Sequence, residues 1–242
     1  MGGLSGGGAN LNFEKIATLT PDVVVVWGKM SGAQKIIEKF EALGTPVLLV
    51  KNDSIKDLVG QFRLYGKLSG NVPRADELIA YTEETLRLVE DMQEKLYKLA
   101  PKRYYFAEGL NSECEGSFHL EPFVYAGAKN ALDCKMSSNY GMEKISAEQL
   151  ILSDPDVIIA MEREFYEGIE KNPRFASLRA VKTKQVYLVP NEPFNYITRP
   201  PSFMRLMGIR WLMSTFYPEV LPKTQTQELR RFQKIFFGIS RS

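Results

Sequence analysis

The chain is poor in the side chains that usually bind a metal ion or act as nucleophiles. His119 is its one histidine, and Cys114 and Cys134 are its only cysteines. A lone histidine in the first turn of an expected helix is more often a surface residue than a ligand. Two glutamates flank Cys114, but adjacent residues do not converge easily on one ion. We therefore treat His119 as a weak metal candidate, expect no resident metal or cofactor, and leave open whether the cysteines are bonded.

No catalytic constellation is evident. Gly3-Leu4-Ser5-Gly6-Gly7 has the spacing of a nucleophile elbow, yet no strand precedes it, and the single histidine is a poor general-base candidate. The same glycine-rich stretch lacks the strand and the spacing of a dinucleotide fingerprint. We predict that the chain is not an enzyme.

Side chains suited to holding an organic molecule follow several expected strands. Ligands of open parallel sheets bind beyond the carboxyl ends of the strands, so residues there are candidates. Aromatic rings supply apolar area, basic side chains pair with anions, and a helix start offers N–H groups. The ligand-binding candidates are Trp27, Lys29, Ser117, Phe118, Tyr140, Tyr196 and Arg199.

Most of these candidates also have a structural interpretation. Arg199 could pair with an anionic group of a ligand or bond backbone carbonyls near Pro200-Pro201. Tyr196 could contact a ligand or be half-buried in lobe packing, and Trp27 could lie at the lip of the site or in the core. Ser117 could donate to an anion or cap the helix that follows it. The sequence leaves these alternatives open.

Two segments of the chain match when they are aligned. In residues 12–25 and 146–159, a glutamate lies seven positions before a Pro-Asp pair, and a β-branched strand follows. These glutamates are Glu14 and Glu148. The match indicates two related α/β halves with one carboxylate at the tip of each. A partner with paired basic residues could bind both carboxylates, and solvated helix positions are the alternative.

The hydrophobic pattern predicts strands and helices in alternation on both sides of one long helix. Residues 73–99 carry apolar residues at helical spacing without an internal Gly or Pro. At about 1.5 Å per residue this helix would be about 40 Å long, which suits a strut between lobes. We therefore expect a first lobe at 1–72, a connecting helix at 73–100 and a second lobe at 101–242. The further expected elements are strands at 22–27, 46–50, 103–107, 156–160 and 185–189, a loop at 109–116, and helices at 12–19, 33–43, 54–68, 117–128, 145–152, 201–216 and 226–237.

The composition is that of an ordinary globular protein. The chain has 242 residues, of which 44% are hydrophobic and 25% charged, with a formal net charge of +2. So small a charge, without a dense Lys/Arg stripe, argues against nucleic acid as a partner. No apolar run approaches the roughly 18–20 residues that span a bilayer. Residues 1–8 have neither the charged region nor the apolar core of a signal peptide.

These motifs together resemble the helical-backbone class (class III) of periplasmic binding proteins, which serve ABC importers of ferric siderophores, haem and cobalamin. The resemblance covers residues 11–238 and rests on the order and spacing of its motifs. These are Asn12-Phe13-Glu14-Lys15-Ile16, Pro21-Asp22-Val23, the helix at 73–99, Ala126-Gly127-Ala128-Lys129-Asn130, Pro155-Asp156-Val157, Phe194-Asn195-Tyr196-Ile197-Thr198-Arg199, Leu206–Leu212 and Tyr217-Pro218-Glu219. Family members carry further βα units before the segment that matches residues 11–16. The resemblance therefore implies an incomplete first lobe with exposed sheet edges.

The resemblance implies an α/β protein of two Rossmann-like lobes with parallel sheets, which captures a ferric siderophore, haem or corrinoid between them and delivers it to an ABC permease. In the family, glutamates at the lobe tips dock on permease arginines, a role that would fall to Glu14 and Glu148. The implied location is the periplasm, or the outer cell surface with a lipid tether. Two alternatives stay open: a binder of a compact metal oxyanion such as molybdate, and a non-transport interaction module of the same fold.

Overall fold

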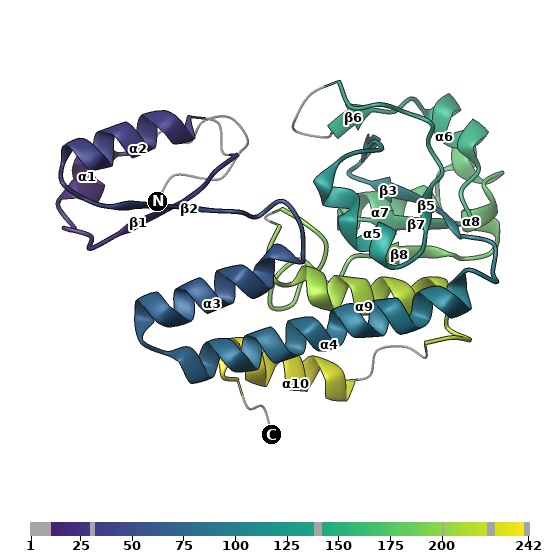
Figure 1. Cartoon of the computed structure of the whole chain (residues 1–242). Coiled ribbons are helices and arrows are strands. Elements are labelled where there is room, and N and C mark those ends of the chain that lie inside the picture. The colour runs from purple at the N-terminus through teal and green to yellow at the C-terminus, as the bar shows by residue number, and fades with distance from the viewer. Residues whose placement is uncertain (1–10, 30–31, 138–141, 200, 222–225, 240–242) are drawn as a thin grey trace.

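The computed structural model of the chain describes residues 11–29, 32–137, 142–199, 201–221 and 226–239. Two α/β lobes stand on the same side of a layer of helices (Figure 1). Each lobe is built on a parallel sheet, and one long helix runs between the two halves of the chain. The expected fold of two lobes and a connecting helix is therefore confirmed.

The first lobe has a parallel sheet of two strands within the described residues. Two helices cover one face of this sheet. Their apolar residues pack with Val26, among them Ile36 and Phe40 of the second helix. Val25 and Leu49, by contrast, are 38% and 58% exposed. The elements of this lobe are α1 (Phe13–Ala17), β1 (Val24–Trp27), α2 (Ala33–Ala42) and β2 (Val47–Val50).

The second lobe has a four-stranded parallel sheet in the order β5-β3-β7-β8. Its central strands are buried on both faces, with Phe106 and Ile159 in one core cluster and Tyr105 and Ile158 in another. This burial explains their continuous apolar sequences. The strands are β3 (Arg103–Ala107), β5 (Lys129–Asn130), β7 (Val157–Ala160) and β8 (Val186–Leu188). The helices are η1 (Phe118–Leu120), α5 (Glu121–Tyr125), α6 (Ala147–Ser153), α7 (Arg163–Ile169), η2 (Pro173–Phe175) and α8 (Arg179–Lys182).

Two sequence-based expectations for this lobe were wrong. The expected loop at 109–116 contains β4 (Asn111–Glu113), which pairs antiparallel with β6 (Met142–Lys144). Strands this short and polar depend on a distant partner and leave little local signal. The expected helix at 117–128 is instead η1 followed by α5, which ends before Gly127, a residue with φ of +71°.

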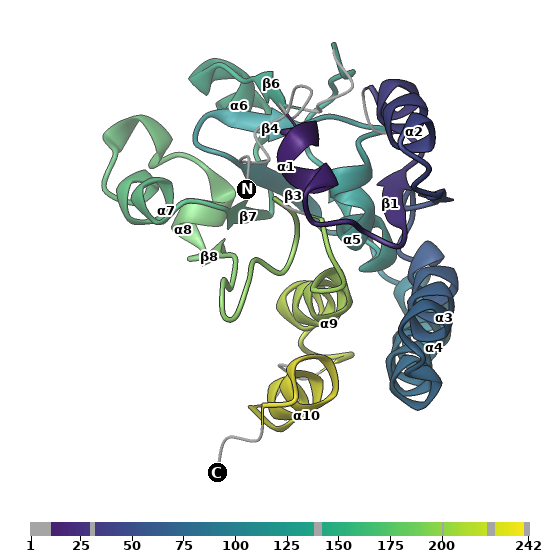
Figure 2. The same cartoon turned by 90° about the vertical axis from the view of Figure 1, so that its left-hand side faces the viewer.

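The helical layer consists of α3 (Asp57–Ser69), α4 (Val72–Leu96), α9 (Arg205–Phe216) and α10 (Thr226–Phe237), seen nearly end-on in Figure 2. α4 is unbroken over 25 residues, so the predicted strut is confirmed. α3 lies within the range predicted for the first lobe, yet it packs along α4. This packing is close because Gly66 faces Ala75, where an added Cβ would come within 2.4 Å. Among the helices formed by the described residues, none combines the length and apolarity that crossing a membrane requires.

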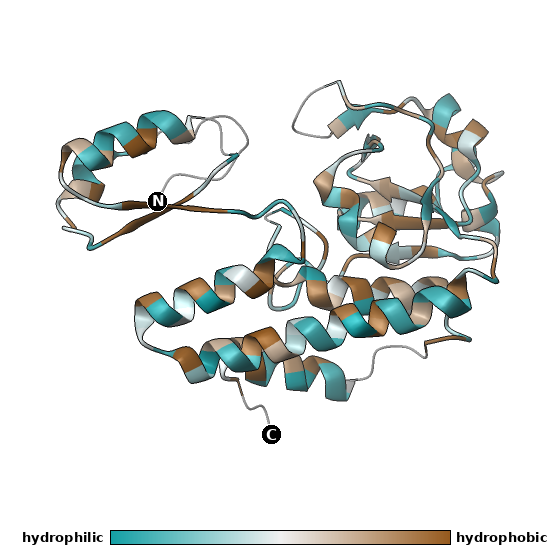
Figure 3. Cartoon of the chain, viewed as in Figure 1, coloured by the Kyte–Doolittle hydropathy of each residue, from teal (hydrophilic) through white to brown (hydrophobic). Residues whose placement is uncertain are grey.

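Aromatic and charged contacts hold α10 against α4. The Tyr81 hydroxyl donates to Glu228 Oε1 over 2.7 Å. The guanidinium groups of Arg210 and Arg231 lie 5.3 and 5.2 Å from the centroid of the Tyr81 ring. Hydrophobic residues of the layer and of the strands in both sheets appear brown in Figure 3, where they alternate along the helices with polar residues. The layer is thus held by its own packing as well as by the lobes.

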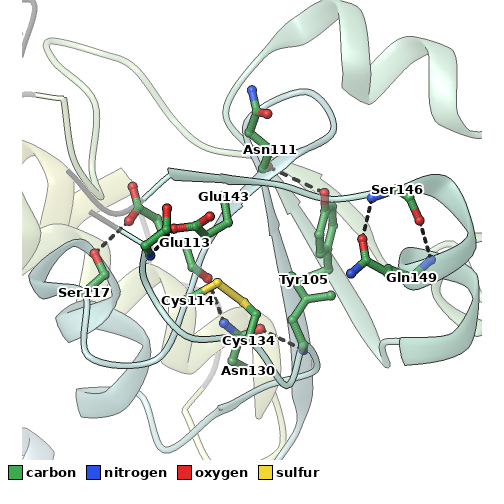
Figure 4. Close-up of a disulfide and its surroundings, with 12 residues drawn as sticks. Tyr105, Asn111, Glu113, Cys114, Ser117, Asn130, Cys134, Glu143, Ser146 and Gln149 are labelled. Carbon is green, nitrogen blue, oxygen red and sulfur yellow. Dashed lines mark hydrogen bonds between the residues drawn. A yellow bond between two sulfur atoms is a disulfide. The ribbon is translucent and has the colours of Figure 1, made fainter. Parts of the chain in front are cut away.

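A disulfide fixes one edge of the second lobe. Cys114 and Cys134 are bonded, with their Cα atoms 5.3 Å apart (Figure 4). The bond joins the residue after β4 to the segment after β5. Close to it, the Asn130 side-chain amide donates to the Glu113 carbonyl over 2.9 Å. The structure thereby decides the cysteine pairing that the sequence left open.

Candidate ligand site between the lobes

The two lobes meet where Trp27 faces Phe118. Trp27 ends β1 and Phe118 opens η1, and the centroids of their rings are 6.0 Å apart. Both side chains are partly exposed. Trp27 lies at the carboxyl end of a parallel strand, where ligands of such sheets bind, and Phe118 lies in the segment that follows β3 and β4. The structure therefore brings together two of the predicted site residues, one from each lobe.

A cavity of about 250 Å³ opens beside Trp27 on the first-lobe side of the site; among the described residues only 27–29, 49–51 and 53 line it, Lys29 and Asp53 included. Lys29 Nζ lies 3.0 Å from Asp53 Oδ2, and the Trp27 indole N–H donates to Asp53 Oδ1 over 3.3 Å. The Lys29 ammonium holds the pKa of Asp53 below its ordinary value. Lys29 thus reaches the predicted site, but its charge is balanced within the first lobe.

Arg199 forms ion pairs with two glutamates of the second lobe. Its Nε donates to both carboxylate oxygens of Glu108 over 2.8 Å, and its Nη2 donates to Glu113 Oε1 over 2.6 Å. Glu108 is 5% exposed and Glu113 is fully buried. Neither sequence interpretation of Arg199 anticipated these internal counter-ions. The available signal was that Glu108 follows a strand at the same sheet edge.

Burial shifts the protonation of both glutamates. Loss of solvent raises the pKa of Glu113 to about 7, although its bond from the Ser117 hydroxyl (2.7 Å) favours the carboxylate. Burial also raises the pKa of Glu108, against the opposing effect of Arg199. A buried carboxyl group retains its charge only where a partner offsets desolvation. Arg199 and Ser117 supply such partners, but they offset only part of the cost of burial.

His119 is buried, so the expectation of a surface histidine was wrong. Its Nδ1 bonds Thr198 Oγ1, and its ring lies 4.0 Å from the Phe118 ring. Burial, with the positive charge of Arg199, lowers the pKa of His119 to about 4. Within the described residues, no three His, Cys, Asp or Glu side chains gather as a metal-binding group. The Ser117 hydroxyl accepts from the His119 N–H over 3.2 Å, which confirms Ser117 as a cap.

Tyr196 and Tyr140 are not brought to the cavity beside Trp27. Tyr196 is 5% exposed and belongs to the main core cluster, in line with its packing interpretation. Its carbonyl oxygen touches α9 at Gly208, where an added Cβ would come within 2.1 Å. Tyr140 lies outside the described residues.

A carboxylate that the sequence analysis missed fixes the linker between β2 and α3. Glu121 accepts bonds from the Ser54 hydroxyl (2.5 Å) and the Ile55 N–H (3.0 and 2.9 Å). It also pairs over 3.0 Å with Arg205, which is 1% exposed. The linker, the second lobe and the start of α9 therefore meet at one carboxylate. This joint determines where the first lobe stands over the helical layer.

Glu14 and Glu148 occupy equivalent positions, as the repeat predicts. Each is the second residue of a short helix whose N-cap, Asn12 or Ser146, accepts a bond from the third. Both glutamates are exposed. Glu148 pairs with Arg174 over 2.5 Å, whereas no residue in the described ranges pairs with the Glu14 carboxylate. Their role in docking stays a prediction.

Replacing Glu121 with alanine should destabilise the protein, because Arg205 would keep its buried charge without a partner. We expect Glu121→Ala to lower the free energy of unfolding by about 3–5 kcal/mol. Urea denaturation measures the change. Glu164→Ala, at an exposed position of α7, is the matched control and should stay near the wild type. Equal stability of the two variants would refute the stabilising role of Glu121.

Glu113 should make the protein less stable as the pH rises. Its pKa is about 7 in the folded protein against an ordinary value of 4.5. The folded state therefore binds the proton more tightly, and this stabilisation is complete below pH 4.5 and disappears as the pH passes 7.

We expect the wild type to lose about 2–3 kcal/mol relative to Glu113→Gln between pH 5 and pH 8. Because His119 titrates in both proteins, its opposing contribution cancels in the difference. Chemical denaturation across this pH range measures it, and Glu115→Gln, at an exposed position, is the control. A constant difference between wild type and Glu113→Gln would disprove the shifted pKa.

Comparisons with known proteins agree with this architecture. A family profile described as a periplasmic binding protein matches residues 4–193. The solved structure of an ABC transporter solute binding protein from Sulfurospirillum deleyianum is 33% identical, with a TM-score of 0.85. That match covers 98% of this chain and 74% of the other.

Two curated relatives that match this chain are longer than it is. The substrate-binding lipoprotein YvrC of Bacillus subtilis, named for an ABC transporter, is 24% identical over 220 residues, 88% of this chain and 67% of the relative. The vitamin B12-binding protein of Vibrio cholerae is 22% identical over 180 residues, 73% of this chain and 63% of the relative. The chain thus spans about two thirds of the length of these relatives. With the matched profile, the 33% identical structure and the two lobes on a helical layer, the chain belongs to the periplasmic binding protein family.

Proposed function

We propose that the chain is the solute-binding component of an ABC importer, which captures a metal chelate or a corrinoid between its lobes. The observation that carries this proposal is the pair of partly exposed rings, Trp27 and Phe118, which face each other from different lobes. Aromatic side chains offer large apolar faces to a macrocycle or an aromatic chelator. The likeness to a vitamin B12-binding protein supports this class of cargo, and the likeness to a substrate-binding lipoprotein of an ABC transporter supports the transport role.

The rigid connection between the lobes suits capture without a large hinge movement. α4 is continuous, and Glu121 bonds the linker that enters α3. Such a connection lets the lobes hold a cargo of set size, and little conformational entropy is lost on binding.

Delivery requires a surface that the permease can bind. We assign this role to Glu14 and Glu148, whose exposed carboxylates mark equivalent places on the two lobes. Paired arginines on the permease would form charge-assisted bonds with both. The proposed location is the periplasm, or the outer cell surface with a lipid tether, as the lipoprotein relative suggests.

Removal of the first lobe's ring should weaken cargo binding. Native mass spectrometry and an absorbance spectrum of protein purified from its own host identify the retained cargo. We expect Trp27→Ala to weaken that cargo's affinity at least about tenfold, since buried aromatic anchors dominate interfaces. Tyr97→Ala removes a 93% exposed aromatic residue at the end of α4 and is the matched control. Unchanged affinity in Trp27→Ala would show that the cargo does not bind against this ring, whereas a wild type that retains no cargo would argue for an interaction module.

Charge reversal at the two lobe tips should abolish delivery but not capture. We expect the double variant Glu14→Lys and Glu148→Lys to lose cargo uptake in cells, because like charges would face the permease arginines. Its affinity for cargo, measured by titration, should match the wild type. Glu164→Lys, with the same charge change at an exposed site of α7, controls for net charge. Normal uptake by the double variant would exclude these carboxylates as docking residues.

A further inference from the structure

Resting on the proposed function, we infer that the site between the lobes selects a cationic or neutral chelate with carbonyl-type oxygens at its surface, and rejects anionic chelates and metal oxyanions. The inference comes from the balance of charges that face the site. It also comes from the guanidinium of Arg199, one N–H group of which remains available to a ligand.

Arg199, at the carboxyl edge of the second sheet, faces more carboxyl groups than it can neutralise, and Arg163 at the same edge is paired with Glu167. Arg199 is already shared between Glu108 and Glu113. A third carboxylate is close, because an added Cβ at Gly109 would lie 3.5 Å from Glu162 Oε2. Glu162 is exposed and lies two residues after the end of β7, at the carboxyl end of the sheet. The surplus charge of this edge is therefore negative.

These carboxyl groups are near enough to influence one another. Burial is the main cause of the raised pKa of Glu108 and of Glu113; the charge of Glu162 adds to the first shift, and the charges of Glu108 and Glu143 add to the second. Mutual repulsion of this kind means that each added negative charge in the site costs free energy. An anionic cargo would add to it, and a cationic cargo would relieve it.

In the facing first lobe, the two basic residues that line the cavity beside Trp27 already have acidic partners. Lys29 Nζ lies 3.0 Å from Asp53, and Lys51 Nζ lies 3.5 Å from Asp57. Below the rings, Arg205 is paired with Glu121. Each of these basic groups therefore has an acidic partner of its own.

Arg199 nevertheless keeps one donor edge. Its side chain is 35% exposed. Its Nε and Nη2 are engaged by Glu108 and Glu113, whereas in the described part of the chain nothing accepts a bond from Nη1. A guanidinium whose charge is neutralised but whose N–H groups are free suits a neutral acceptor, such as the oxygen of an amide or a hydroxamate. It gives an anion little net attraction.

Titration of the intact protein with three iron complexes and one oxyanion tests the selectivity. The probes are a ferric trihydroxamate with a free ammonium group, the same complex with that amine acetylated, a trianionic ferric tricatecholate, and molybdate. We expect the cationic complex to bind tightest and the neutral one about fivefold more weakly. Since one like-charge contact costs about a factor of five in water, the tricatecholate and molybdate should bind at least tenfold more weakly than the neutral complex. The preference for the cationic complex should shrink as salt is added.

A pair of variants separates local charge from net charge. Glu162→Gln should reduce the ratio of cationic to neutral affinity by about two- to fivefold. Glu170→Gln, at the far end of α7, removes the same charge and should leave the ratio unchanged.

The outcomes distinguish this inference from the proposed function. Tightest binding of the tricatecholate or of molybdate would overturn the inference while leaving a cargo-binding protein. An equal fall in the ratio for both variants would overturn it too, because the effect would then come from net charge alone. If the wild type bound none of the four probes or any cargo from its host, the proposed function would fail and the inference with it.

Discussion

The position of the first lobe depends on the carboxylate of Glu121. That group bonds the backbone and side chain of the linker after β2, and it neutralises the fully enclosed Arg205 at the start of α9. A buried guanidinium requires such a partner, because an unpaired buried charge costs several kcal/mol. The requirement of Arg205 for a counter-ion therefore also sets the place of the linker. Through the linker it sets the distance between Trp27 and Phe118.

The close packing of the helical layer holds both lobes in fixed positions on one base. α3 packs on α4 through the contact between Gly66 and Ala75, and α9 packs on the second lobe through the contact between Gly208 and Tyr196. Both contacts leave no space for a side chain, so the helices cannot slide without a loss of packing. The lobes consequently stand on a stiff base. In this architecture the dimensions of the ligand site follow from the packing of helices below it.

Several basic groups around the site are balanced by acidic partners, whereas the carboxyl edge of the second sheet carries an excess of acidic groups. Lys29, Lys51 and Arg205 each have an acidic partner. At the carboxyl edge of the second sheet, however, Arg199 is outnumbered by carboxyl groups, two of which are buried. Burial of acidic groups at a strand end is costly for stability, and such costs are common where a surface is shaped for binding. The charge of the cargo should therefore matter most at that edge.

The sequence by itself determined the features whose causes are local. The strands near residues 24–27 and 157–160, the unbroken α4 and the capped helices that present Glu14 and Glu148 all follow from nearby residue patterns. Only the tertiary structure decided the pairs that join distant positions. Arg199 meets Glu108 across 91 residues, and His119 meets Thr198 across 79. Hydrophobic periodicity and helix caps depend on neighbouring residues, so the sequence alone predicts them. The partner of a buried charge depends on how the fold brings distant strands and loops together.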